Sequence, residues 1–390
     1  MKVISEVARR TDDSKLTDWY FGIDRWLIIY IFIMIAIGVI ATFFTGSANI
    51  IRTHGRLPWY HFFVNMLPFY ILGIGTLFAA SMFNKKWVIK ISWLNVLVCL
   101  PLLVMTLFHA SVVNGSARWV SVAGQNLMPS DIMKPGFIII TAWFLTRMKK
   151  LYGEDIFINR DAWKFNINSW WPYVIVFLMV LGILFKQPDI GTTILYFSVF
   201  AAMLFVAGLP KKWLAILGGV VVGGGICAFL FWHHVHERIM DFLFKPLDPT
   251  SQVGYAVNAI RQGGLFGMGE EAFAIERLPM AENDFVFAAL VEEFGALAGC
   301  LLLWLFVKVI KHLISAAENA RDKFVLYAIT GTTALFSFQI CLNLATTLHI
   351  MPPKGMTLPF ISFGGSSFLG FCLLFGFILA LIREDKWRSA

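Results

Sequence analysis

Apolar residues are grouped along the chain into runs of about 20 residues, and short polar segments separate these runs. A helix of that length spans the hydrocarbon core of a bilayer. We therefore predict ten transmembrane helices, at residues 26–45, 62–83, 87–108, 130–148, 170–186, 190–208, 213–232, 285–307, 324–347 and 367–382. The expected fold class is an all-α polytopic membrane protein, with a single transmembrane domain over residues 26–382.

The composition supports a membrane protein. The 390 residues are 58% hydrophobic and only 14% charged, with a mean hydropathy of +0.73. A soluble domain of this size does not need so large an apolar fraction. The first apolar run is also too long for the core of a cleaved signal peptide, so we expect it to remain as an anchor.

The distribution of Lys and Arg predicts that both termini are cytoplasmic. With that orientation, 22 of the 32 Lys and Arg residues fall in cytoplasmic segments, as the positive-inside rule requires. Residues 1–25 and 383–390 are then cytoplasmic tails, and residues 233–284 form a large external loop between the seventh and eighth helices. The rule also accounts for the net charge of +8, so no nucleic-acid partner is expected.

Three predicted external segments are rich in Gly, Pro and polar residues. They are NGSARWVSVAGQNLMPSDIMK, the 233–284 loop and MPPKGMTLPFISFGGSS. Irregular backbone at membrane depth is tolerated where it lines a cavity or is covered by protein. We therefore expect the three segments to meet around one outward-facing cavity.

Three acids accompany the eighth helix, in LPMAENDFVFAALVEEFG. Asp284 lies at the helix start, where either it or Asn283 could cap the helix; the alternative is a general base facing the cavity. Glu292 lies roughly 12 Å further along and within about 80° of the same helix face. Since a buried acid in a membrane is functional by default, we place Glu292 in the cavity and Glu293 in helix packing.

The segment before the fourth helix carries candidate phosphate ligands. In PSDIMK, Ser130 is the expected N-cap, and Lys134 falls in the first turn, where a cation opposes the helix dipole. Lys134 therefore needs a counter-anion, either Asp131 or a phosphate. Arg118, which Trp119 follows, and Lys134 are candidates for binding a phosphorylated lipid; the alternative for each is an interfacial cation with no ligand.

Two further segments offer polar groups to the cavity. In QPDIGTT, Asp189 is either a helix cap or a cavity carboxylate. In ISFGGSS, the glycines and the hydroxyls of Ser366 and Ser367 suit either a re-entrant turn or contact with a polar head group.

Other motifs do not support nucleotide or metal chemistry. RQGGLFGMG (261–269) follows no strand, so we reject a nucleotide-binding loop and expect a tight or re-entrant turn. HHVHER (233–238) fits no helical pair of metal ligands. The glycines at 223–225 are expected to allow close helix packing.

Taken in order, five blocks of the sequence resemble the SEDS family (FtsW, RodA, SpoVE). They are NGSARWVSV…MPSDIMK, KQPDIGTTI, DPTSQVGYAVNAIRQGGLFGMG, LPMAENDFVFAALVEEFG and MPPKGMTLPFISFGGSS, and the resemblance covers nearly the whole chain. The form KGMTLPFIS is similar to the cell-division branch of the family, FtsW.

The resemblance implies a peptidoglycan glycosyltransferase in the bacterial inner membrane. Such an enzyme polymerises lipid II at the periplasmic face, at the division septum, with a class B penicillin-binding protein (FtsI-like) and other divisome proteins as partners besides membrane lipids. Asp284 matches the family's essential acid, Glu292 a second important carboxylate, and Arg118 with Trp119 the family's RW pair.

The chain departs from the family pattern at four positions. Asp131 stands where the family usually has Glu, Phe363 replaces the Tyr of ISYGGSS, Asn283 replaces a frequent Thr, and Pro135 directly follows Lys134. None of these changes removes the expected base. Phe363 excludes a phenolic hydroxyl at its position.

The expected reaction needs one base and a counter-charge for pyrophosphate. Asp284 would deprotonate the attacking sugar hydroxyl, and Arg118, Lys134 or a divalent cation (Mg²⁺ or Mn²⁺) would stabilise the leaving group; no cofactor is otherwise expected. A lipid II flippase and a non-enzymatic divisome scaffold are the alternative functions. A flippase usually has internal repeats, and none is detected.

Overall fold

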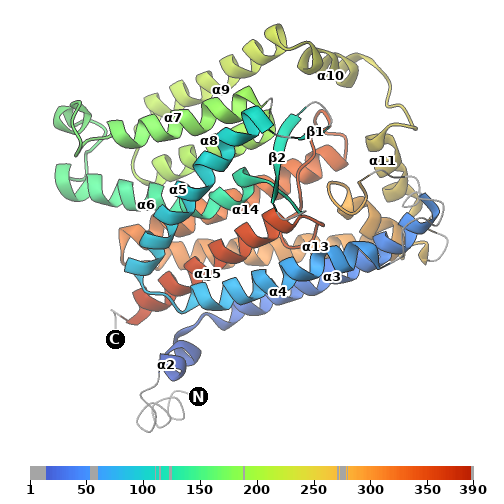
Figure 1. Cartoon of the computed structure of the whole chain (residues 1–390), viewed down its shortest axis with the longest axis horizontal. Helices are drawn as coiled ribbons and strands as arrows, with labels where there is room; N and C mark the ends of the chain where they lie inside the picture. The colour runs from blue at the N-terminus through green and yellow to red at the C-terminus, as the bar shows by residue number, and fades with distance from the viewer. Residues whose placement is uncertain are drawn as a thin grey trace.

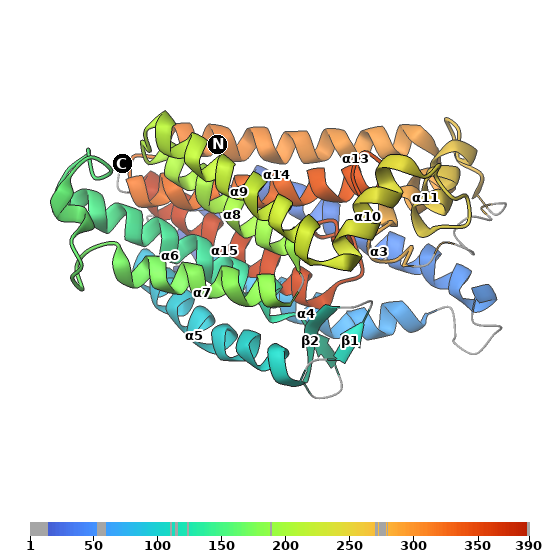
Figure 2. The same cartoon turned by 90° about the horizontal axis from the view of Figure 1, so that it is seen from above.

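The computed structural model describes residues 15–52, 60–109, 111–113, 116–122, 125–187, 189–269, 272, 278 and 280–387. Long helices dominate this part of the chain and run alongside one another as a bundle (Figures 1 and 2). The all-α membrane fold is therefore confirmed in its main feature.

Each of the ten predicted spans falls on a helix. The ten are α3 (Arg25–Arg52), α4 (His61–Ser81), α5 (Lys85–His109), α6 (Pro129–Tyr152), α7 (Trp171–Lys186), α8 (Ile190–Val206), α9 (Lys211–Phe231), α13 (Val286–Glu318), α14 (Lys323–Thr347) and α15 (Gly365–Trp387). Seven of the helices in the described residues are long and apolar enough to cross a membrane. The helices α7 and α8 are apolar but have 16 and 17 residues, so a count of ten spans remains a prediction.

The core of the bundle is built around α15, which is buried along most of its length. It packs against α4, α6 and α14. Phe368, Phe371 and Phe375 are fully buried on it and pack edge-on or tilted against Phe360 or Phe336 of the neighbouring segments. This aromatic core holds the start of α15, with Ser366 and Ser367, at a fixed position.

Some local structure was not predicted from the sequence. The segment between α5 and α6 forms a small antiparallel sheet in the order β1 (Ser111–Val113), β2 (Ser116–Val122), β3 (Gln125–Leu127). The predicted external loop contains α10 (His233–Phe244) and α11 (Gln252–Gln262), and α2 (Lys15–Gly22) lies in the N-terminal tail. Hydrogen bonding between short polar strands has no periodic apolar signal, which is why the all-α expectation missed the sheet.

The prediction for the glycines of α9 is wrong. A Cβ atom built on Gly223, Gly224 or Gly225 would meet no atom within 4 Å. These glycines therefore do not mediate close packing with another described helix of this chain.

A break in α13 is hydrogen-bonded to the turn that follows α11. Gly295 has φ 86° and ψ 169°, outside the helical region. The turn replaces the lost helix bonds: Met268 N donates to Glu292 O at 2.8 Å, and Ala296 N donates to Gly264 O at 2.9 Å. RQGGLFGMG thus forms a tight turn, as predicted, and it fixes the first turns of α13.

We predict that Gly267→Ala destabilises the protein more than Gly208→Ala. Both glycines have positive φ, 86° and 92°, where any other residue costs about 1–2 kcal/mol. A Cβ on Gly267 would also lie 2.2 Å from Glu293 O, whereas one on Gly208 meets nothing within 4 Å. Thermal unfolding of the purified variants in detergent measures the difference in melting temperature. Equal decreases for the two variants would contradict the close packing of Gly267 against α13.

Candidate active site

A cavity of about 470 Å³ opens between the sheet, α6, α13, α14 and the start of α15. Its volume is within the range of small-molecule sites. The three segments that the sequence predicts to meet all contribute to its lining: Arg118 and Trp119 from β2, Asn283 and Asp284 before α13, and residues 353–357 and 363–367 before and at α15.

Asp284 lies in this cavity and does not cap α13. The N-cap residue is Phe285, with no side-chain cap bond, so the capping interpretation of Asn283 or Asp284 is wrong. Burial raises the pKa of Asp284 to about 6, while the charges of Arg118 and Lys354 act to lower it and that of Glu282 to raise it. A carboxyl with this pKa is mostly ionised at neutral pH and is a stronger base than an ordinary Asp.

Three consecutive backbone carbonyl groups at Asp284 and the two residues before it accept hydrogen bonds from other segments. Phe363 N donates to Glu282 O at 2.8 Å, and Ser362 Oγ donates to Asn283 O at 2.5 Å. Asn343 Nδ2, from α14, donates to Asp284 O at 2.8 Å. Two segments distant in sequence therefore hold the acid in place, as preorganised catalysis requires.

Gly355 packs directly against the Asp284 side chain. A Cβ atom on Gly355 would lie 2.3 Å from Asp284 Oδ2. Only a residue without a side chain leaves the carboxylate in its observed position. The Asp284 carboxylate therefore packs against the backbone of the 353–357 segment.

A fully buried carboxylate, Asp189, organises two cations at the cavity wall. Its side chain has no exposed surface, and it pairs with Lys354 Nζ at 2.8 Å and with Arg118 Nε at 3.4 Å. Asp189 also caps α8 by accepting from Thr192 N at 3.2 Å, so the cap interpretation is confirmed, whereas Asp189 itself is not part of the cavity lining. Burial acts to raise the pKa of Asp189, but the Lys354 and Arg118 charges outweigh it and the pKa lies below its usual value.

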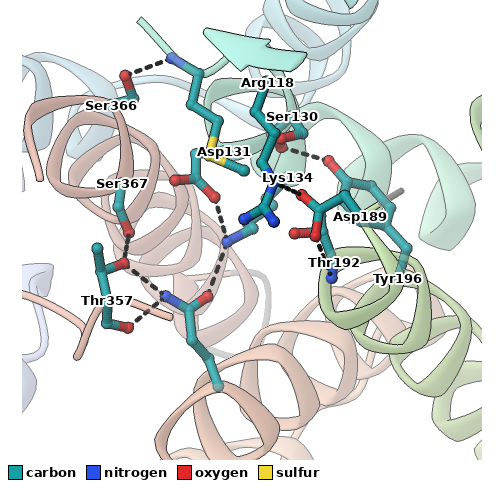
Figure 3. A network of polar contacts seen from close by, with 12 residues as sticks. Arg118, Ser130, Asp131, Lys134, Asp189, Thr192, Tyr196, Thr357, Ser366 and Ser367 are labelled. Carbon is teal, nitrogen blue, oxygen red and sulfur yellow. Dashed lines mark hydrogen bonds and ion pairs between the residues drawn. The ribbon is translucent and has the colours of Figure 1, made fainter. Parts of the chain in front are cut away.

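Lys134 is the centre of a second polar network (Figure 3). Its Nζ pairs with Asp131 Oδ1 at 2.6 Å and donates to Gln339 Oε1 at 2.8 Å. Gln339 Nε2 donates to Thr357 O at 2.9 Å, and Thr357 Oγ1 donates to Ser367 Oγ at 2.9 Å. Asp131 is thus the counter-anion of Lys134, and all five side chains line or border the cavity.

Two predicted details of the α6 start are different in the structure. Met128 is the N-cap and Pro129 the first helical residue, so Ser130 is not the cap; its carbonyl accepts from Tyr196 Oη at 2.6 Å. Ser366 Oγ accepts from Met128 N at 2.9 Å. Ser366, in the first turn of α15, therefore ties the start of α6 to the cavity lining.

Glu292 is not brought together with the other predicted site residues. Its side chain is completely buried, and it is not part of the cavity lining. The angle was estimated by extending an ideal helix back to Asp284, whereas α13 begins at Val286, so Asp284 does not share the helical geometry of Glu292. Glu293 is half-buried beside the turn that follows α11.

Four residues of the site were not predicted from the sequence: Lys354, Gln339, Asn343 and Gly355. A signal was present for two of them. Gln339 and Asn343 are four residues apart inside an apolar helix, so they share one face, and polar residues at such depth are functional candidates. Lys354 and Gly355 lie in an irregular loop, where the spacing of residues does not predict which way a side chain points.

The described residues contain no group of three or more His, Cys, Asp or Glu side chains placed to hold a metal ion.

Comparisons with known proteins agree with the geometry. The family model described as cell cycle protein (FtsW, RodA and SpoVE) matches residues 25–387. The probable peptidoglycan glycosyltransferase FtsW of Caulobacter vibrioides (strain NA1000 / CB15N) is 31% identical over 376 residues, which cover 96% of this chain and 93% of that protein. The corresponding protein of Aliivibrio salmonicida (strain LFI1238) is 32% identical over 395 residues, covering 96% and 94%.

Solved structures share the fold. A chain from a peptidoglycan synthase complex that coordinates polymerization and crosslinking superposes with a TM-score of 0.71 at 23% identity, over 93% of this chain and 98% of that chain. The rod shape determining protein RodA of Thermus thermophilus superposes with a TM-score of 0.62 at 20% identity, over 93% and 97%.

Proposed function

The chain belongs to the FtsW, RodA and SpoVE family of cell cycle proteins, and on this premise we propose that it is a peptidoglycan glycosyltransferase that polymerises lipid II. The observation that carries the proposal is one cavity in which a raised-pKa carboxyl, Asp284, faces the cations Arg118, Lys134 and Lys354. This combination supplies a base for a sugar hydroxyl and counter-charge for a pyrophosphate.

Asp284 is the proposed general base. It takes the proton from the 4-hydroxyl of one lipid-linked disaccharide, and the resulting oxygen nucleophile attacks the anomeric carbon of a second. The C–O bond to undecaprenyl pyrophosphate breaks as the new glycosidic bond forms. A single displacement inverts the α linkage to β-1,4, so a second carboxylate is not required as nucleophile.

The cations stabilise the leaving group. Negative charge grows on the pyrophosphate oxygens as the bond breaks, and a preorganised cation is most effective in a site from which water is excluded. Asp189 and Asp131 hold Lys354, Arg118 and Lys134 in place before substrate binds. Because each cation keeps an acidic partner, the cavity is not strongly positive when empty.

Reconstitution in liposomes tests the function directly. Purified protein with lipid II and the cognate class B penicillin-binding protein is expected to produce glycan chains. Lipid II that crosses the bilayer without chain formation would identify a flippase, and the absence of both activities would leave a scaffold as the remaining function.

We place the reaction at the periplasmic face of the inner membrane at the division septum, where other divisome proteins assemble.

We predict that polymerisation increases with pH through an apparent pKa of about 6. Asp284 has its pKa raised to about 6, so the base is protonated below this pH and ionised above it. Initial rates from pH 5 to pH 8 measure the profile. Glu282→Gln removes a charge that raises this pKa and should move the profile to lower pH, whereas Lys354→Gln removes a charge that lowers it and should move the profile to higher pH. A profile that neither variant moves would contradict the assignment.

A further inference from the structure

The segment between α6 and α7 is anchored by four side chains in the main hydrophobic core of the bundle. Ile156 and Ala162 are fully buried in it, and Phe157 and Trp170 are nearly so. One turn of 3₁₀-helix, Arg160–Trp163, is capped by the side chain of Asn159. The segment is therefore an ordered unit at the end of the bundle where the C-terminus also lies (Figure 2).

This unit exposes an apolar patch, here called the α6–α7 patch, formed by Ile158, Trp163, Phe165, Ile167 and Trp213. Phe165 is 78% exposed, Ile167 85% and Ile158 72%. Because burial of large apolar side chains is favourable, an ordered backbone that leaves three of them uncovered by the protein is a candidate for contact with another surface. Such a patch indicates an interaction surface.

Stacked tryptophans fix the patch to the ends of two helices. The Trp163 ring stacks on Trp170 at 5.6 Å and on Trp213 at 6.5 Å, with interplanar angles of 14° and 15°. Trp170 precedes α7, and Trp213 lies in the first turn of α9. Tryptophan at helix ends is typical of the membrane–water interface.

Exposed cations surround the patch. They are Arg147, Lys150, Arg160, Lys164, Lys211 and Lys212. Of the nearby acids, Glu154 already bridges Lys149 and Lys323, Asp161 pairs with Lys164, and Asp155 is exposed. The surface therefore has an excess of positive charge around an apolar centre.

We propose that the α6–α7 patch binds the anionic cytoplasmic leaflet, with Phe165 and Ile167 at the acyl boundary and the surrounding cations on acidic phospholipid headgroups. Apolar side chains interleaved with Lys and Arg match such a leaflet in both polarity and charge. The positive-inside distribution places this end of the bundle at the cytoplasmic side. A soluble protein partner would not require the patch to coincide with the ends of three apolar helices and a tryptophan stack.

Photo-crosslinking tests which partner covers the patch. Benzoylphenylalanine placed at Phe165 or at Ile167 in cell membranes is expected to form phospholipid adducts, detected by mass spectrometry of the purified protein. The same probe at Thr250, an exposed residue in the loop between α10 and α11, is expected to form no adduct with acidic phospholipid. A protein adduct at Phe165 and Ile167, or no adduct at all, would overturn the proposal.

Native mass spectrometry tests the charge selectivity. Titration with phosphatidylglycerol is expected to show binding about 25-fold weaker for the double variant Arg160→Gln with Lys164→Gln, because each basic residue near an anionic surface contributes about fivefold in affinity. Phosphatidylcholine binding should not change. The matched double variant Lys186→Gln with Arg261→Gln, away from the patch, should bind phosphatidylglycerol like the wild type. Equal phosphatidylglycerol binding by the two double variants would refute the proposal.

Discussion

Replacing Asp284 with Asn is expected to reduce glycan polymerisation by about 10²–10⁴-fold, the usual contribution of a general base. Asn occupies nearly the same volume and keeps the three backbone carbonyl contacts at residues 282–284, so the protein should fold. Only the ability to accept a proton is lost. Turnover of lipid II in the reconstituted system, normalised to folded protein, measures the effect.

Glu293→Gln is the matched control for this experiment. It removes an acid from the same sequence block, but Glu293 lies outside the cavity lining and beside the turn that follows α11. We expect activity within about twofold of the wild type, because surface substitutions away from a site are usually nearly neutral. Near-normal activity of Asp284→Asn, or equal losses in both variants, would refute the assignment of the base.

The bundle could be predicted well because its signal is local. Apolar runs of spanning length occur once per helix, and every predicted span from 26–45 to 367–382 falls on a helix of the structure. The meeting of the three predicted external segments followed from their polar and Gly/Pro-rich composition, since such backbone needs a cavity. Arg118, Asp131, Lys134, Asp284, Ser366 and Ser367 all line the cavity that results.

Predictions failed for side chains whose direction depends on contacts between segments that are distant in sequence. Glu292 was placed by continuing an ideal helix from Asp284, but Asp284 precedes the first helical residue, Val286. Lys354 was not recognised because its role depends on Asp189, which is 165 residues away in sequence. No periodicity encodes such a pair.

Replacing Asp189 with Asn is expected to reduce polymerisation about 100-fold and to destabilise the protein. Asn can still cap α8, so the substitution removes only the charge. Arg118 and Lys354, both largely buried, would then repel one another without the carboxylate between them. Breaking a buried ion pair costs about 3 kcal/mol, and mispositioned cations lose their stabilisation of the leaving group, which is worth about 10²–10³-fold for one donor.

A second substitution separates the two effects of Asp189→Asn. Adding Lys354→Gln removes one of the unbalanced cations, so the double variant should regain part of the lost thermal stability, as expected for coupled neighbours. Polymerisation should not recover, since one of the three cations that stabilise the pyrophosphate is now absent. Recovery of both properties together would mean that Asp189 acts only on folding. An Asp189→Asn variant with undiminished activity would mean that the cations do not need the carboxylate to reach the substrate.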